Sequence, residues 1–187
     1  MDLNIYKDLT EEYFFFNKEY EKSKIVFIGD SITKRFNINE FTGECEIINR
    51  GIFYDTTLGL LNRIDSNINS LKISKVFIMI GYNDLKIRTN NEIISNIKKI
   101  VTEIKAEKVY LQSLLPVSFE RKELNNRIVF INSEIKKIAD NQKVFFIDLY
   151  SHFKSDKNYI NPRLTRDGIH PNYYGNKLWF SVIEEYL

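Results

Sequence analysis

Serine, histidine and aspartate, the residue types that together perform acyl transfer, stand out at two points of the chain. Ser31 lies in Gly29-Asp30-Ser31-Ile32-Thr33, and His170 ends Asp167-Gly168-Ile169-His170. A serine hydroxyl becomes a strong nucleophile when a histidine takes its proton and a carboxylate holds that histidine. One turn of chain would bring Asp167 and His170 to the same pocket. We therefore interpret Ser31 as a nucleophile, His170 as its base and Asp167 as the orienting acid; the alternative for Ser31 is a turn serine that caps a helix.

Hydrogen-bond donors for a developing oxyanion can be found in three segments. Ser31 is expected at a helix start, where its own N–H is available. Gly51, in Asn49-Arg50-Gly51-Ile52, can present a second backbone N–H, and Asn83, in Gly81-Tyr82-Asn83-Asp84, can present a side-chain amide. Gly51 and Asn83 are also ordinary turn residues, so each segment alone leaves both interpretations open.

Four other residues have simpler explanations. Asp30 stands beside the candidate nucleophile, and we expect it to stabilise the turn. His152 lacks a carboxylate at the spacing seen before His170, so we expect it either at the surface or next to the catalytic residues without contact to the substrate. Cys45, the single cysteine, is expected to be a small buried side chain, and Trp179 is expected to pack in the core.

The pattern of short apolar runs and longer helical periods places these residues on a parallel α/β sheet. Gly29, Gly51 and Gly81 follow the first three runs directly or one residue later, where tight turns meet the carboxyl ends of the strands and where ligands bind in open sheets. Strands are predicted at Lys24–Ile28, Glu46–Asn49, Lys75–Ile80, Lys108–Gln112 and Lys143–Ile147.

Helices are predicted where apolar residues recur at a spacing of three and four. Thr89 and Glu92 predict a capping box at the start of the second helix. The apolar sets are Leu60, Leu61, Ile64, Ile68 and Leu71; Ile93, Ile94, Ile97, Ile100, Val101 and Ile104; Leu124, Ile128, Ile131, Ile135 and Ile138; and Leu178, Trp179, Val182, Ile183 and Tyr186.

The 187 residues predict one domain over the whole chain, with residues 1–22 as an N-terminal helical extension. Aromatic side chains of this extension, from Tyr13 to Tyr20, are expected to pack on the same domain, the alternative being a second subunit. No repeat or Gly/Ser/Pro-rich linker divides the chain.

Taken together, the four segments resemble the four blocks of the SGNH (GDSL-type) hydrolase superfamily, in the same order and spacing. The blocks correspond to Ser31, Gly51, Asn83 and the Asp167–His170 pair, and the resemblance runs from about Lys24 to Leu187. Their flanks are similar to the bacterial branch that includes lysophospholipase-like and platelet-activating-factor acetylhydrolase-like esterases. Ile32 replaces the leucine of Gly-Asp-Ser-Leu, and no catalytic group is missing.

This resemblance implies a three-layer α/β/α, flavodoxin-like SGNH hydrolase fold with a five-stranded parallel sheet. It implies a serine ester hydrolase that works through an acyl-enzyme without a metal or an organic cofactor. Phe53, Tyr54 and Tyr82 are expected to bind substrate, because aromatic rings stand where relatives carry smaller residues. Short loops without a large lid favour short-acyl esters such as O-acetylated carbohydrates; the alternatives are a lysophospholipase or thioesterase activity.

Charge and hydropathy narrow the kinds of partner. The net charge of +2 is spread along the chain, which argues against nucleic acid and favours a small-molecule ester. No apolar run approaches the roughly 20 residues that span a bilayer. The acidic first residues do not resemble a secretory signal, and we expect a cytoplasmic protein. A rival hypothesis is a noncatalytic glycan- or nucleotide-binding module on the same sheet, although no phosphate-loop pattern is present.

Overall fold

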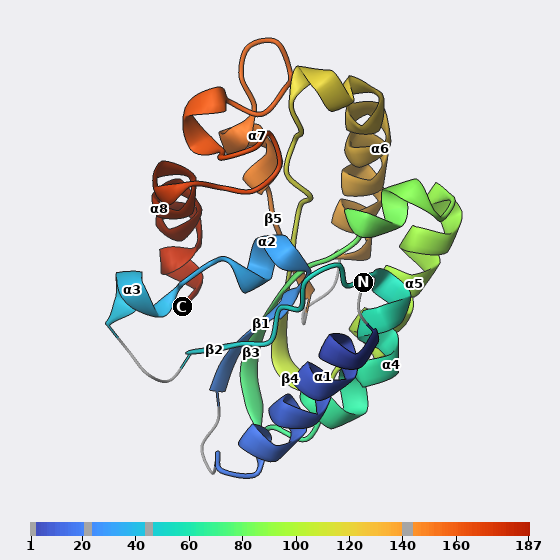
Figure 1. Cartoon of the computed structure of the whole chain (residues 1–187), viewed down its shortest axis with the longest axis vertical. Coiled ribbons are helices and arrows are strands. Elements are labelled where there is room, and N and C mark those ends of the chain that lie inside the picture. Colours follow the sequence, from blue (N-terminus) through green and yellow to red (C-terminus); the bar gives the residue numbers. More distant parts are fainter. Residues whose placement is uncertain (1–2, 21–23, 44–46, 140–143) are drawn as a thin grey trace.

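A five-stranded, all-parallel sheet forms the centre of the computed structural model, which describes residues 3–20, 24–43, 47–139 and 144–187. The strands lie in the order β2-β1-β3-β4-β5, as Figure 1 shows. Their bounds are β1 Lys24–Gly29, β2 Ile47–Asn49, β3 Ile73–Met79, β4 Ala106–Gln112 and β5 Val144–Ile147. The predicted sheet is confirmed, with β3 and β4 each beginning two residues before the predicted start. Glu46, Lys143 and Cys45 lie outside the described residues.

Helices cover both faces of the sheet and confirm the predicted layered α/β fold (Figure 1). One layer holds α4, α5 and α6, with α1 packed against α4, and the other holds α2, α3 and α8. The bounds are α1 Leu3–Asn17, α2 Ser31–Lys34, α3 Asn39–Thr42, α4 Thr57–Asn67, α5 Asn90–Glu103, α6 Lys122–Ile138, α7 Leu149–Phe153 and α8 Tyr173–Ile183. Single 3₁₀ turns lie between these elements or at the end of the chain, at Asn83–Lys86, Phe119–Arg121, Pro162–Leu164 and Glu184–Tyr186.

Aromatic rings form a ladder across four neighbouring strands. Phe27 stacks on Phe77 at 4.6 Å, Phe77 on Tyr110 at 4.7 Å, and Tyr110 on Phe145 at 5.2 Å between ring centroids. Each pair is a directly aligned pair of the parallel ladder, so strand register alone brings the rings together. Trp179 of α8 is fully buried, which confirms its predicted place in the core.

Local capping sets where the helices begin. The predicted capping box at α5 is confirmed: the Glu92 N–H donates to Thr89 Oγ1, and the Thr89 N–H donates to Glu92. α4 begins at Thr57 because the Thr56 side chain accepts from the Gly59 N–H. α4 ends at Asn67, so Ile68 and Leu71 of the predicted set are buried beyond the helix.

The aromatic N-terminal segment forms α1, which packs against α4 of the same chain, as predicted. Tyr13 is buried there, while Phe15 and Phe16 are largely exposed. The division of the chain into a single domain with residues 1–22 as an extension stays a prediction.

Candidate active site

Ser31 is the first residue of α2, directly after β1 and the turn residue Asp30. The Asp30 carboxylate caps this helix by accepting the Ile32 N–H at 2.9 Å, which fits the turn-stabilising role predicted for it. Burial raises the pKa of Asp30 to about 7. This short turn directs the half-buried Ser31 side chain toward the segment that carries His170, and Ser31 Oγ lies 2.9 Å from His170 Nε2.

The segment from Thr165 to Pro171 folds into a compact loop around Asp167. One carboxylate oxygen accepts the backbone N–H groups of Ile169 at 3.1 Å and His170 at 2.9 Å, and the other lies 2.7 Å from His170 Nδ1. Burial works against ionisation of Asp167, but these hydrogen bonds and the histidine outweigh it and lower its pKa. Asp167 therefore holds the ring with Nε2 directed at Ser31.

Gly168 lets this loop pack closely on the rest of the molecule. Its φ of +80° is left-handed, and a Cβ at this position would lie 2.6 Å from the Ser118 side chain. The Ser118 N–H donates to the Gly168 carbonyl at 3.0 Å. The loop that carries Asp167 and His170 is thereby fixed against the segment that follows β4.

Gly51 lies just past the end of β2, and its N–H already has a partner. It donates to Asn49 Oδ1 at 2.8 Å, while Asn49 Nδ2 donates to the carbonyls of Thr33 at 2.7 Å and Phe36 at 3.0 Å. A substrate oxyanion would therefore share the Gly51 N–H with Asn49. Sequence reasoning did not single out Asn49, whose only signal was its place two residues before Gly51.

Asn83 begins the 3₁₀ turn after β3. Its amide donates one hydrogen to the Asp55 carbonyl at 2.9 Å, and within the described part of the chain the second amide hydrogen has no hydrogen-bond partner. The neighbouring buried Asp84 accepts from the Thr57 N–H at 2.9 Å and from Thr57 Oγ1 at 2.6 Å. The turn that presents Asn83 is thus anchored to the start of α4.

The three aromatic residues predicted to bind substrate differ in exposure. Tyr54 is 66% exposed and Phe53 39% exposed, whereas Tyr82 is only 6% exposed. Burial raises the pKa of Tyr82 to about 12, and among the described residues its hydroxyl has no hydrogen-bond partner. The Phe53 and Tyr54 side chains are therefore accessible at the surface, and Tyr82 is mainly an internal residue.

Phe53 and Tyr54 border a cavity of about 330 Å³ between α1 and the loop after β2. Arg35 also lines this cavity, and its guanidinium carbon lies 5.5 Å from the Phe53 ring centroid. Tyr54 has a left-handed φ of 62°, which is unusual for a large side chain. The lining residues are Ile5, Tyr6, Leu9, Arg35, Ile52, Phe53 and Tyr54.

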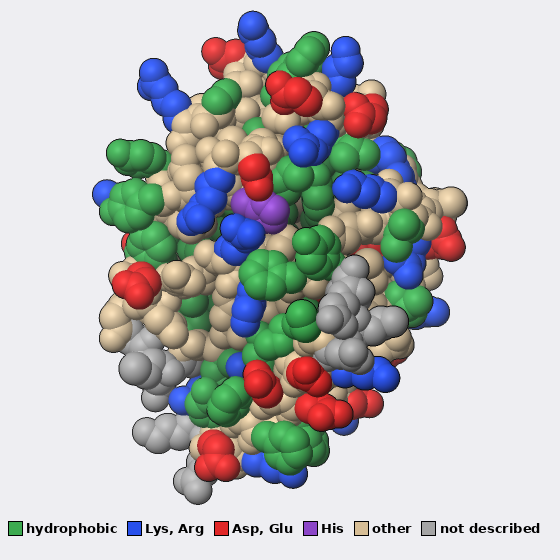
Figure 2. Space-filling model, viewed as in Figure 1, with side chains coloured by type: hydrophobic (Ala, Val, Ile, Leu, Met, Phe, Trp, Pro, Cys, Tyr) green, Lys and Arg blue, Asp and Glu red, His purple; other side chains and the backbone are tan. Residues whose placement is uncertain are grey.

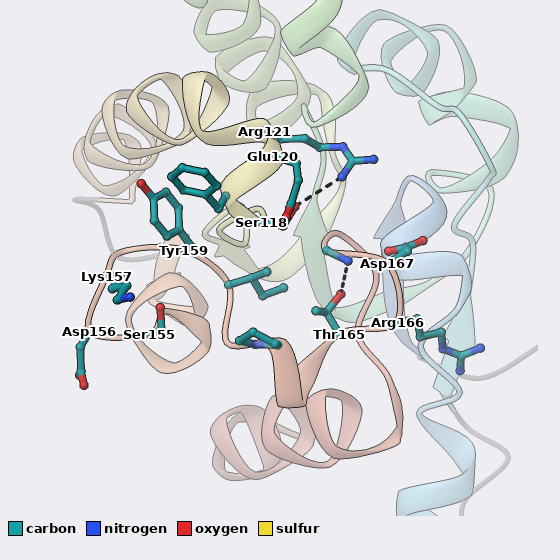
Figure 3. Close-up of a pocket in the computed structure, with 14 residues that line it drawn as sticks. Ser118, Glu120, Arg121, Ser155, Asp156, Lys157, Tyr159, Thr165, Arg166 and Asp167 are labelled. Atoms are coloured by element: carbon teal, nitrogen blue, oxygen red, sulfur yellow. Dashed lines mark hydrogen bonds between the residues drawn. The ribbon is translucent and has the colours of Figure 1, made fainter.

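A larger hollow of about 770 Å³ lies beside Asp167 (Figure 3). Phe119 and Tyr159 form one wall, with ring centroids 5.2 Å apart in an edge-to-face arrangement. Figure 3 shows Tyr159 on the side opposite Asp167 and Arg166, with Thr165 between them. The hollow thus combines aromatic, hydroxyl and charged groups.

One face of the molecule mixes charges of both signs (Figure 2). Figure 2 shows a histidine near the centre of one face, an acidic side chain beside it and Lys or Arg side chains around it. His152 is exposed on α7, in agreement with its predicted surface position. Within the described ranges, no helix is both long and apolar enough to cross a membrane.

Comparisons with known proteins show the family and the fold of the chain. Residues 27–178 match the GDSL-like lipase/acylhydrolase family. No curated protein matches the chain in sequence.

Solved structures extend this likeness over nearly the whole chain. A protein assigned as an acylhydrolase from Bacteroides fragilis has 27% identity and a TM-score of 0.84, with 94% of each chain covered. One assigned as a platelet activating factor from Streptococcus pneumonia has 24% identity and a TM-score of 0.88, with 98% of this chain and 93% of that chain covered. A catalytic mutant of an acetylxylan esterase from Geobacillus stearothermophilus has 21% identity and a TM-score of 0.75, with 88% and 94% covered.

Proposed function

Because the chain belongs to the GDSL-like lipase/acylhydrolase family, we propose that Ser31, His170 and Asp167 are its catalytic residues and that an acyl-enzyme forms on Ser31. Its family makes the chain a carboxylic ester hydrolase. The observation that carries the residue assignment is the 2.9 Å contact between Ser31 Oγ and His170 Nε2, made between opposite ends of the sequence.

The reaction follows from this geometry. With the Nδ1 proton held by Asp167, His170 Nε2 accepts the Ser31 proton as Oγ attacks the acyl carbonyl carbon. The tetrahedral intermediate collapses when His170 returns the proton to the departing alcohol oxygen, leaving the acyl group on Ser31. A water molecule then gives a proton to His170 as its oxygen attacks the acyl carbonyl carbon. His170 returns that proton to Ser31 Oγ when the second tetrahedral intermediate collapses, which breaks the acyl–Oγ bond and releases the carboxylic acid and free Ser31.

We assign three donors to the proposed oxyanion hole. The Ser31 N–H belongs to the first turn of α2, where backbone donors have no partner within the helix. Asn83 offers its second amide hydrogen, and Gly51 offers an N–H shared with Asn49. Each such donor contributes roughly 3 kcal/mol when it is fixed in advance.

For the substrate, we propose a short-acyl ester of a carbohydrate or of a similarly polar alcohol. His170 must protonate the departing alcohol, so a large alcohol would extend past this residue toward the hollow beside Asp167. An aromatic wall with hydroxyl and charged groups suits a sugar better than a long acyl chain. Tyr54 and Phe53 would then contact the acyl side of the ester. The predicted cytoplasmic location stays a prediction.

The runner-up is a lysophospholipase or thioesterase activity, which the cavity lined by Ile5, Leu9 and Ile52 favours, since it offers apolar surface for a longer chain. A panel of p-nitrophenyl esters from two to twelve carbons, measured beside O-acetylated sugars, distinguishes the two. We expect kcat/KM to fall as the acyl chain lengthens. A rise toward twelve carbons would overturn the short-acyl proposal.

Replacement of the nucleophile tests the catalytic assignment. Ser31→Ala should lower turnover of p-nitrophenyl acetate on the order of 10⁴-fold or more, because no acyl-enzyme can form. A fluorophosphonate probe should label the parent at Ser31 and leave Ser31→Ala unlabelled. Ser181→Ala, an exposed serine on α8, is the control and should keep both properties. A parent protein that resists labelling would favour the noncatalytic binding module.

A further inference from the structure

Helix α1 lies outside residues 27–178, the part of the chain that matches the family, yet two of its tyrosines reach the loops that carry the proposed oxyanion donors. Tyr6 and Tyr13 lie about two turns apart and so share one face of the helix. That face is directed at α4 and at the loop between β2 and α4.

Tyr6 acts on the loop that orients Asn83. Its hydroxyl donates to Asp55 Oδ1 at 3.1 Å, and the Asp55 backbone carbonyl accepts the Asn83 amide at 2.9 Å. Asp55 is buried, and its other carboxylate oxygen is bound by Arg63 at 2.8 Å. Burial, followed by the Asp55 charge, raises the pKa of Tyr6, so the hydroxyl keeps its proton and remains a donor.

Gly59 of α4 leaves the space in which Tyr6 meets Asp55. A Cβ at Gly59 would lie 2.2 Å from Asp55 Oδ1 and 3.1 Å from the Tyr6 hydroxyl oxygen. Glycine inside a helix costs stability relative to alanine. The close approach of α1, α4 and the Asp55 loop thus depends on this position.

Tyr13 connects the Gly51 loop to the helix that Ser31 begins. Its hydroxyl donates to the Gly51 carbonyl at 3.1 Å and accepts from Lys34 Nζ at 2.8 Å. Lys34 is the last residue of α2. The nucleophile helix and the second donor loop therefore meet at one buried hydroxyl.

Further contacts hold α1 at this position. Asn17 accepts from Arg50 Nη2 at 2.7 Å, and Arg50 directly precedes Gly51. The Asn17 amide donates to the Asn67 carbonyl at 2.9 Å at the end of α4. The helix is thus bonded to the Gly51 loop at Arg50 as well as at Gly51 itself.

We propose that Tyr6 and Tyr13 are positioning residues of the oxyanion hole: Tyr6 fixes the Asn83 amide through Asp55, and Tyr13 fixes the Gly51 peptide relative to the Ser31 helix. This inference rests on the proposed function. Oxyanion donors stabilise the transition state only when they are held in place before reaction, and a small displacement lowers the rate without weakening substrate binding.

The two tyrosines are proposed to position different donors, so their variants should respond differently to the loss of one donor. A general structural role would not produce that difference. Tyr6→Phe and Tyr13→Phe keep the ring and remove only the hydroxyl. Each should lower kcat for p-nitrophenyl acetate about tenfold with KM little changed. Asn83→Ala should lower kcat on the order of a hundredfold. In that background Tyr6→Phe should have no further effect, whereas Tyr13→Phe should still lower kcat about tenfold, as expected for independent effects.

Several outcomes would overturn the inference while leaving the esterase itself established. They are parental kcat in both tyrosine variants, an effect of Tyr6→Phe that adds fully to that of Asn83→Ala, or loss of folding in both variants, measured by thermal unfolding. Tyr174→Phe, an exposed tyrosine on α8, is the matched control and should retain parental kcat. Failure of the proposed function would instead show in the parent, as turnover that does not depend on Ser31.

Discussion

At the scale of single residues, the most unusual feature beside the nucleophile is the buried carboxyl group of Asp30. Burial raises its pKa to about 7, well above the value of about 3.9 expected in an unfolded chain. The folded state therefore binds a proton that the unfolded state releases between these two values. The resulting stabilisation is complete below about pH 4 and is lost as the pH rises to about 7.

Asp30→Asn should remove this loss, since the amide oxygen can still accept the Ile32 N–H and carries no charge. We expect the variant and the parent to be equally stable at pH 4 and the variant to be more stable at pH 8, by up to about 4 kcal/mol. Urea unfolding at both pH values measures the difference. Asp148→Asn, an exposed cap of α7, is the control and should change stability little at either pH. Parallel pH profiles for parent and Asp30→Asn would contradict the prediction.

Tyr54 holds a large aromatic side chain in a left-handed backbone conformation with φ 62°. This conformation costs an L-residue about 1–2 kcal/mol. Tyr54→Gly should therefore keep or raise stability, by up to about 1 kcal/mol after the greater freedom of unfolded glycine is counted. If Tyr54 binds the ester, the same variant should raise KM several-fold in initial-rate assays.

Asn158→Gly separates the two effects. Asn158 also has a left-handed φ, of 59°, and it is exposed and lines neither the cavity beside Phe53 and Tyr54 nor the hollow beside Asp167. Its glycine variant should gain little stability, because asparagine tolerates this conformation, and its KM should stay at the parental value. A Tyr54→Gly enzyme with parental KM would remove Tyr54 from the proposed substrate site.

At the scale of secondary structure, patterns that are local in sequence were predicted well. The five strands were recognised from their β-branched and aromatic runs, and the start of α5 from Thr89 and Glu92. The helix start at Ser31 was expected and is the start of α2, but the four- and five-residue helices α3 and α7 were not predicted, because periodicity cannot be read over a single turn. β3 begins at Ile73 because pairing with Lys24 of β1 and Ala106 of β4 extends the ladder backward.

The candidate site was predictable where its residues occur in short motifs. Ser31, Gly51 and Asn83 follow strand ends, and the Asp167–His170 pair lies shortly before α8. The residues that hold these groups were missed, because Tyr6, Tyr13 and Arg63 have ordinary neighbours in sequence. Their partners come from other elements, so only the packing of α1 and α4 on the loop after β2 reveals them.

At the scale of the whole molecule, one buried ion pair joins α4, the sheet and the site. Arg63 and Asp55 are almost completely buried, 2.8 Å apart, and Arg63 Nη2 also lies 3.5 Å from the Gly29 carbonyl at the end of β1. A buried pair of this kind adds little net stability over apolar residues, but the loss of one partner is costly. Its role in stability and its role in catalysis can therefore be separated.

Arg63→Met should destabilise the protein by about 3–5 kcal/mol in urea unfolding, since Asp55 stays buried without its cation. The double variant Asp55→Leu/Arg63→Met should recover most of that loss. Its kcat should nevertheless stay well below the parent's, because the Tyr6 hydroxyl and the Thr56 N–H lose the carboxylate that accepts them. Lys137→Met, which breaks the exposed pair with Glu134, should change stability by less than about 0.5 kcal/mol. Parental kcat in the double variant would mean that the Asp55 side chain does not support the oxyanion loop, and that the pair serves the fold alone.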